Sequence, residues 1–226
     1  MRLLVLNCDF DPDPATNGGH IIEQYLKKAP MVEVVSMRCF ENELPTHVEL
    51  YDGVIITGSR ASVYEDLPWI ERLRETIRTI DQQRIPLLGI CFGLQILADS
   101  LGGRVEKSGR FEEGFRTLCV DTEHWLFQGM PTLSVVYQSH GDVMTKLPED
   151  ARVLSQSWCC EAFCRNNSVG VQFHPEITLH VAQRMAERDG NALDTSLVDS
   201  EKASRDSLRI LDNFLLFCAL QETRRK

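Results

Sequence analysis

The sequence predicts a doubly wound α/β domain, in which helices cover both faces of a mostly parallel sheet, with a small antiparallel extension. Two observations lead to this prediction. Short and nearly continuous apolar runs alternate with longer stretches of helical periodicity along the first part of the chain. Between residues 105 and 171 the pattern changes to short strands and turns, which indicates an antiparallel extension rather than a separate domain.

The individual elements follow from the positions of these runs. Strands are expected at 3–7, 32–37, 53–57, 86–90 and 133–137, with shorter ones at 117–121, 152–157 and 161–164. Helices are expected at 18–28, 68–82, 93–101 and 200–221. Ligands of such folds bind beyond the carboxyl ends of the parallel strands. The loops 8–17, 58–66 and 89–93 and the segment after Phe173 are therefore the expected site.

We expect a single domain over residues 1–226, with a core over about residues 1–185. The segment 188–204 is rich in Asp, Ser and Asn and lacks periodicity. Such a segment is typical of a surface loop or linker, and a C-terminal helix over 205–222 is expected to follow it.

The composition excludes two classes of partner. The net charge is −9 and the basic residues are scattered, so the electrostatic attraction that drives nucleic-acid binding is missing. No apolar run approaches the roughly 18 residues that a membrane helix needs.

The eight cysteines are spread along the chain, several of them within apolar runs. This distribution favours reduced thiols and a cytoplasmic location over a disulfide framework.

Cys91 is the candidate nucleophile. It stands at the end of an apolar strand, before a predicted helix, in the sequence Gly89-Ile-Cys91-Phe-Gly93. This is the pattern of a nucleophile elbow, where small neighbours allow a sharp turn that exposes the reactive atom. Backbone amides at the helix start favour negative charge, so they favour a thiolate, and the amide of Phe92 can face a developing oxyanion. The alternative is a cysteine that fills the core as a small apolar residue.

His174 and Glu176 are the candidate base and its orienting acid. They close the buried-looking strand Gly170-Val-Gln-Phe-His174-Pro-Glu176. Residues two apart in a strand point the same way, so Glu176 can accept a hydrogen bond from one ring nitrogen of His174 while the other faces the thiol. This is the logic of a catalytic triad. The alternative is a structural histidine at the end of a strand.

Together these segments resemble the class I (triad-type) glutamine amidotransferases, whose signatures are G-x-C-x-G-x-Q and H-P-E in this order. The resemblance covers roughly residues 1–185 and extends to guanylate-synthase-type domains and to stand-alone γ-glutamyl peptidase-like relatives. Two further segments match: 56–64 is similar to the family's glycine-rich oxyanion loop, and Ser139-His-Gly-Asp142 to its S-H-G segment.

The resemblance implies a flavodoxin-like fold and hydrolysis of a glutamine side-chain amide through a thioester on Cys91. It also implies roles for other residues. The backbone amides of Ser59 and Phe92 would form the oxyanion hole. The substrate would be bound by residues from three segments, Gly58, Gln95, Ser139, His140, Gly141 and Asp142, although for His140 a structural role is favoured.

The partner expected from the resemblance is glutamine or another γ-glutamyl small molecule. Ammonia released from glutamine would need an acceptor enzyme, and the residues after position 185 are too few for an ATP-using synthetase domain, so a synthetase partner would be a separate chain. Gly58-Ser59-Arg60 departs from the Gly-Gly-Pro usual in guanylate-synthase-type domains. That departure leaves open a stand-alone γ-glutamyl peptidase or hydrolase. An inactive binding or regulatory homologue is the third alternative.

No cofactor and no metal are expected. Cys159, Cys160 and Cys164 lack the nearby second pair of ligands that zinc sites usually have. The acidic segment 9–13 is expected to be a solvated loop near the active edge, where a role in substrate gating stays open.

Overall fold

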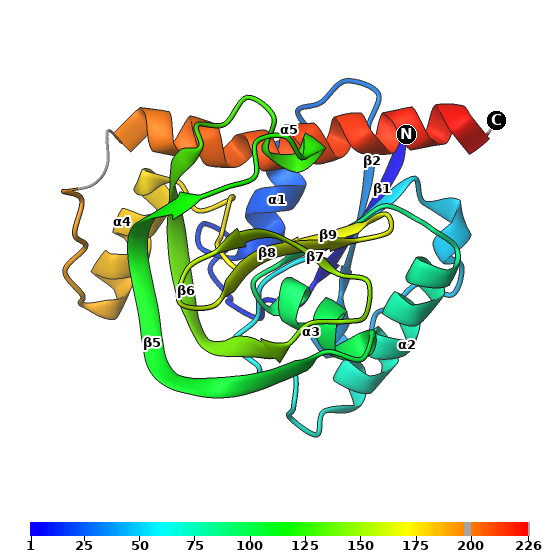
Figure 1. The fold of residues 1–226 in the computed structure, drawn as a ribbon, viewed down its shortest axis with the longest axis horizontal. Coiled ribbons are helices and arrows are strands. Elements are labelled where there is room, and N and C mark those ends of the chain that lie inside the picture. The colour runs from blue at the N-terminus through cyan, green and yellow to red at the C-terminus, as the bar shows by residue number, and fades with distance from the viewer. Residues whose placement is uncertain (197–199, 226) are drawn as a thin grey trace.

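The computed structural model describes residues 1–196 and 200–225, and it confirms the doubly wound α/β fold with an antiparallel extension (Figure 1). The main sheet has seven strands in the order β2-β1-β3-β4-β9-β8-β7. Its parallel strands are β1 (Arg2–Asn7), β2 (Glu33–Arg38), β3 (Gly53–Ile56), β4 (Leu87–Ile90) and β9 (Ser168–Val171). Two antiparallel strands, β8 (Cys160–Arg165) and β7 (Arg152–Gln156), extend one edge.

Helices cover both faces of this sheet, as the continuous apolar runs predict. On one face lie α2 (Pro68–Gln82) and α3 (Phe92–Ser100), and on the other α1 (Gly18–Leu26) and α5 (Ser200–Arg225) (Figure 1). Strand β1 shows the consequence, because Leu4 packs in the cluster that contains α2 and Leu3 in the cluster that contains α5. Both side chains are fully buried.

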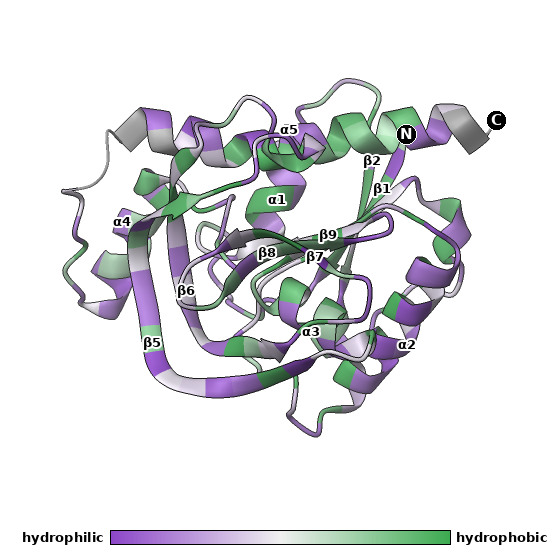
Figure 2. Cartoon of the chain, viewed as in Figure 1, coloured by the Kyte–Doolittle hydropathy of each residue, from purple (hydrophilic) through white to green (hydrophobic). Residues whose placement is uncertain are grey.

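The antiparallel extension is larger than predicted. Strands β5 (Arg104–Cys119) and β6 (Leu133–Lys146) form a separate two-stranded sheet that curves around one side of the molecule (Figure 1). The expected strands 117–121 and 133–137 cover one end of this pair. The rest of β5 is largely hydrophilic (Figure 2) and its pairing with β6 shifts register between Lys107 and Glu112, so no alternating apolar pattern marks it in the sequence.

Helix α4 (Leu179–Asp189) was not predicted. The side chain of Thr178 caps its first turn and Gly190 ends it in the left-handed conformation. The expected loop 188–204 overlaps both helices: Arg188 and Asp189 belong to α4, and α5 begins at Ser200, where the helix expected over 200–221 begins. Positions 197–199 of that loop lie outside the described residues. None of the helices in the described ranges has the length and apolar character of a membrane span.

Candidate active site

The four segments expected at the site meet in one cleft of about 590 Å³ at the carboxyl edge of the parallel strands. Residues following β1, β3, β4 and β9 line one side of it, and β6 and α4 line the other. Among the lining residues are Asp9, Gly58, Cys91, Ser139, His174 and Arg188. The fold thus brings the sequence motifs together at the position where doubly wound proteins bind ligands.

Cys91 occupies a strained turn between β4 and α3. Its backbone has φ 52° and ψ −105°, a conformation that residues with a side chain rarely adopt. The glycines on either side allow this turn by close backbone approach. A Cβ atom on Gly89 would lie 2.4 Å from the carbonyl oxygen of Gly93, and one on Gly93 would lie 2.2 Å from the carbonyl oxygen of Ile56. The elbow geometry therefore requires both glycines.

The thiol of Cys91 lies between β6 and β9 and is almost buried. Its Sγ donates to the carbonyl oxygen of Ser139 at 3.7 Å, and the side-chain amide of Gln172 donates to Sγ at 3.6 Å. Sequence reasoning did not single out Gln172. The available signal was a polar residue inside an otherwise apolar strand, between Val171 and Phe173.

His174 is held between Glu176 and Cys91. Its Nδ1 lies 2.8 Å from Oε1 of Glu176, its ring lies next to the side chain of Cys91, and its backbone amide donates to the carbonyl oxygen of Tyr137 at 2.8 Å. Burial alone would lower the pKa of His174. The charge of Glu176 and the interaction with Cys91 outweigh it and raise that pKa well above its usual value. Such a histidine can take and hold the proton of the thiol.

The proposed oxyanion hole joins the loop after β3 to the start of α3. The ring of Phe92 is in the core, 5.6 Å from that of Trp69, which fixes the first turn of α3. As the first residue of the helix, Phe92 has an amide with no acceptor within α3. Ser59 lines the cleft, and its Oγ accepts a hydrogen bond from the amide of Ala61 at 3.1 Å. The side chain that replaces a family glycine thus bonds to its own loop.

The residues of the S-H-G-D segment lie on β6 and line the cleft. Gln95 is buried and donates to the carbonyl oxygen of Asp142 at 3.1 Å and to the side chain of Gln172 at 3.2 Å. The carboxylate of Asp142 accepts from the hydroxyl of Tyr64 at 3.0 Å. Gln95 therefore ties the α3 side of the cleft to β6. His140 is buried, and Gly141 lies beside Phe111 of β5.

A charged rim surrounds the mouth of the cleft. Asp11 pairs with Arg188 of α4 and lies 3.6 Å from Arg60 of the loop after β3. Burial raises the pKa of Asp9, whose carboxylate accepts from the amide of Gly18 at 2.8 Å. The acidic segment is therefore built into the site. Sequence reasoning missed Arg188 because it assigned this position to a loop.

Solved structures of other proteins share this fold. A glutamine amidotransferase from Thermotoga maritima superposes with a TM-score of 0.80 at 24% identity, over 96% of this chain and 97% of that one. A protein from Thermoplasma acidophilum, described as a putative GMP synthase subunit, gives a TM-score of 0.70 at 22% identity, over 100% and 98% of the two chains. At these identities the likeness shows the fold.

Sequence comparison shows the family. The chain is 37% identical over 129 residues to a glutamine-hydrolysing GMP synthase of Bacillus pumilus, covering 55% of this chain and 24% of that protein. It is 36% identical over 168 residues to the glutamine-hydrolysing GMP synthase of Lactobacillus delbrueckii, covering 70% of this chain and 32% of that protein. The chain thus spans about a quarter to a third of these relatives. The family model described as glutamine amidotransferase class-I matches residues 17–190, and the chain belongs to this family.

Proposed function

We propose that the chain hydrolyses the side-chain amide of glutamine through a γ-glutamyl thioester on Cys91. One observation carries this proposal: Cys91 stands on a strained elbow in a cleft, next to a histidine that is paired with a buried glutamate. This spatial arrangement of nucleophile, base and orienting acid is the one that cysteine-dependent acyl transfer needs.

The reaction follows from this arrangement. Sγ of Cys91 attacks the amide carbon while His174 takes the thiol proton, and the oxyanion that forms faces the backbone amides of Ser59 and Phe92. His174 gives its proton to the nitrogen, the C–N bond breaks and ammonia leaves. Water then attacks the thioester with His174 as base, which releases glutamate and restores the thiol. Glu176 holds the imidazole and stabilises its charged form.

The released ammonia would pass to a separate acceptor enzyme. The names of the relatives support a synthetase as the acceptor, because they combine glutamine hydrolysis with a synthase. The fold neighbour from Thermoplasma acidophilum is named as part of a synthase. None of the eight cysteines, all of which lie in the described ranges, forms a disulfide, and this supports a reducing compartment such as the cytoplasm.

A second candidate is a γ-glutamyl hydrolase whose leaving group is an amino acid or peptide. The rim favours it, since Arg60 extends into solvent at the mouth, with a side chain that is 60% exposed and a long ion pair of 3.6 Å to Asp11. A guanidinium there can bind the carboxylate of a leaving group with two parallel hydrogen bonds. Ammonia has no group that uses such a contact.

Steady-state kinetics of the purified chain distinguish the two candidates. Substrates are glutamine and a panel of γ-glutamyl peptides, and the variants are Arg60→Ala and, as control, the exposed Arg104→Ala on β5. A peptide hydrolase predicts turnover by the chain alone and a higher KM for carboxylate-bearing peptides in Arg60→Ala, with no change in the control. Negligible turnover on every substrate, followed by activation with a synthetase fraction, would refute the hydrolase and favour the glutaminase that serves a synthetase. Glutamine turnover that persists in Cys91→Ala would refute both.

A further inference from the structure

Beside the cleft, a second group of chemically reactive side chains is buried where three strands meet. A ring nitrogen of His140, Sγ of Cys159 and a carboxylate oxygen of Glu161 all lie within 4.8 Å of one another. His140 is on β6, Cys159 is in the turn between β7 and β8, and Glu161 is on β8. These three residue types are the ligands that zinc prefers in proteins.

His140 is oriented as a ligand. Its Nδ1 lies 3.2 Å from the carbonyl oxygen of Asp142, and this contact requires a proton on Nδ1. The lone pair is then on Nε2, which is buried and has no hydrogen-bond partner among the described residues. Burial lowers the pKa of His140, so the ring is neutral at pH 7. A carbonyl that fixes the tautomer from the far side of the ring is the usual second contact of a metal-binding histidine.

Cys159 and Glu161 supply the negative charge. The Glu161 side chain is fully buried, and its two oxygens accept from neutral donors, the amide of Gln138 at 2.7 Å and the hydroxyl of Ser157. Sγ of Cys159 lies 3.5 Å from Oε1 of Glu161. Burial, together with the charge of Glu161, raises the pKa of the Cys159 thiol. A divalent cation would offset both the buried carboxylate and a thiolate.

We propose that His140, Cys159 and Glu161 bind a zinc ion. Binding forms bonds from the metal to Nε2, Sγ and a carboxylate oxygen, and the proton displaced from the thiol leaves to solvent. One thiolate and one carboxylate balance the charge of Zn²⁺. Oε2 of Glu112 lies 3.8 Å from Nε2 of His140 and accepts a hydrogen bond from Nε1 of Trp158 at 2.6 Å, so it adds a further negative charge beside the site.

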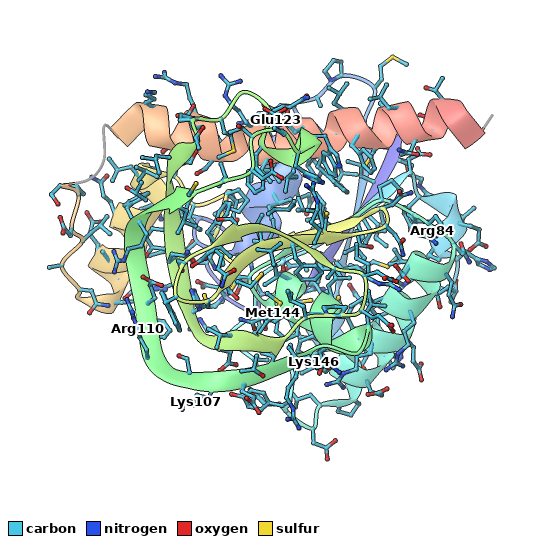
Figure 3. The ribbon with its side chains drawn as sticks, in the orientation of Figure 1. Arg84, Lys107, Arg110, Glu123, Met144 and Lys146 are labelled. Carbon is cyan, nitrogen blue, oxygen red and sulfur yellow. The ribbon has the colours of Figure 1, made fainter. Side chains whose placement is uncertain are left out.

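Other side chains shield this site from solvent. The ring of Trp158 stacks on that of His140 with centroids 5.9 Å apart, and the guanidinium of Arg110 lies over Trp158 at 4.8 Å. Arg110 extends from the curved part of β5 (Figure 3). The metal would join β6 to the β7–β8 turn next to Ser139, whose carbonyl oxygen contacts the candidate nucleophile. Its role is therefore structural, and it supports the wall of the cleft.

The test must exclude metal binding by Cys91 and His174, which are also a thiol and an imidazole. All measurements therefore use the full chain with Cys91→Ser. Zinc content is measured by mass spectrometry of the element after growth with added zinc and gel filtration. We expect about one zinc per chain, and with zinc about 100-fold above Kd a rise in Tm on the order of 5 °C that a chelator reverses.

Two further substitutions locate the site. Cys159→Ser should weaken zinc binding at least about tenfold. Cys160→Ser is the matched control, because its Sγ faces the carbonyl oxygen of Ala162 at 3.5 Å, and it should keep the zinc. If Cys159→Ser does not fold, the Cys91→Ser protein is loaded with cobalt in place of zinc. The expected result is an absorption band from a thiolate bound to cobalt. Less than about 0.1 zinc per chain in Cys91→Ser, no thiolate band with cobalt, or equal zinc content in the two folded cysteine variants would overturn the proposal.

Discussion

Gly58 lies against the imidazole of His174, and a methyl group at this position tests how closely His174 must approach Cys91. A Cβ atom on Gly58 would lie 2.9 Å from Cε1 of His174 and 3.8 Å from Cβ of Cys91. Ordinary contact begins at 3.4 Å, so Gly58→Ala must displace the ring by about 0.5 Å. Glu176 holds Nδ1 at 2.8 Å, so the ring can move only by loosening that bond or its contact with the thiol.

The displacement sets the size of the effect. A misplacement of about 1 Å at a reacting group can cost about 100-fold in rate, so about 0.5 Å predicts a loss in kcat of roughly 10- to 100-fold for Gly58→Ala. This corresponds to about 1.4–2.7 kcal/mol of activation free energy. The assay measures the ammonia released from glutamine at a saturating substrate concentration. It uses the purified chain alone or, where that shows no turnover, the chain with the synthetase fraction.

Thr57→Ser is the control for Gly58→Ala. Thr57 is buried next to Gly58, and its hydroxyl accepts from the amide of Cys8 and donates to the carbonyl oxygen of Gly58. Serine keeps these hydrogen bonds, so kcat should stay within about twofold. Full activity in a folded Gly58→Ala protein would show that the contact between His174 and Cys91 does not limit the rate. It would contradict the predicted loss.

Two of the remaining predictions concern the candidate triad, and the third concerns a buried histidine outside the cleft. Cys91→Ala should lower kcat at least about 10⁴-fold because no thioester can form, whereas Cys160→Ala should stay near wild type; equal rates by glutamine assay would contradict this. Glu176→Gln should slow turnover less than His174→Ala, since the carboxylate orients the ring and exchanges no proton, and kinetics showing equal losses would refute that role. In the folded chain, burial lowers the pKa of His124 to about 4, whereas its usual value is 6.5. As pH drops from 6.5 towards 4, the unfolded chain therefore binds a proton that the folded chain does not, and the free energy of unfolding falls. His124→Asn should flatten this loss in urea unfolding, and an unchanged pH slope would count against it.

The parallel sheet could be predicted because its strands are apolar on both faces. Leu3 and Leu4 point to opposite faces of β1 and both are buried, so the run is continuous and easy to recognise. The polar part of β5 carries no such pattern, because its pairing with β6 is interrupted at Lys107. Helix α4 had recognisable ends in Thr178 and Gly190, but a surface position gave its interior few apolar residues.

The candidate site was predictable where its chemistry is local in sequence. Cys91 with its glycines, and His174 with Glu176, are short motifs whose geometry follows from one turn or one strand end. Gln172 reaches the thiol only through the register of β9 beside β4. Contacts of this kind depend on which strands become neighbours, and no spacing along the chain encodes them.

The grouping of His140 with Cys159 and Glu161 illustrates the same limit. Sequence reasoning tested Cys159 against the neighbouring cysteines and expected no metal. The structure turns Cys160 toward the carbonyl oxygen of Ala162 and places Cys159 beside Glu161. The third member, His140, comes from another sheet.

The proposed reaction depends on a covalent γ-glutamyl intermediate at Cys91, and peptide mapping can detect the corresponding adduct. The purified chain is treated with a glutamine analogue that carries an electrophile at the side-chain carbonyl, then digested and analysed by mass spectrometry. We expect one adduct, on Cys91, that excess glutamine prevents and that forms more slowly in His174→Ala. An adduct on any other cysteine, or labelling of Cys91 that glutamine does not reduce, would contradict it.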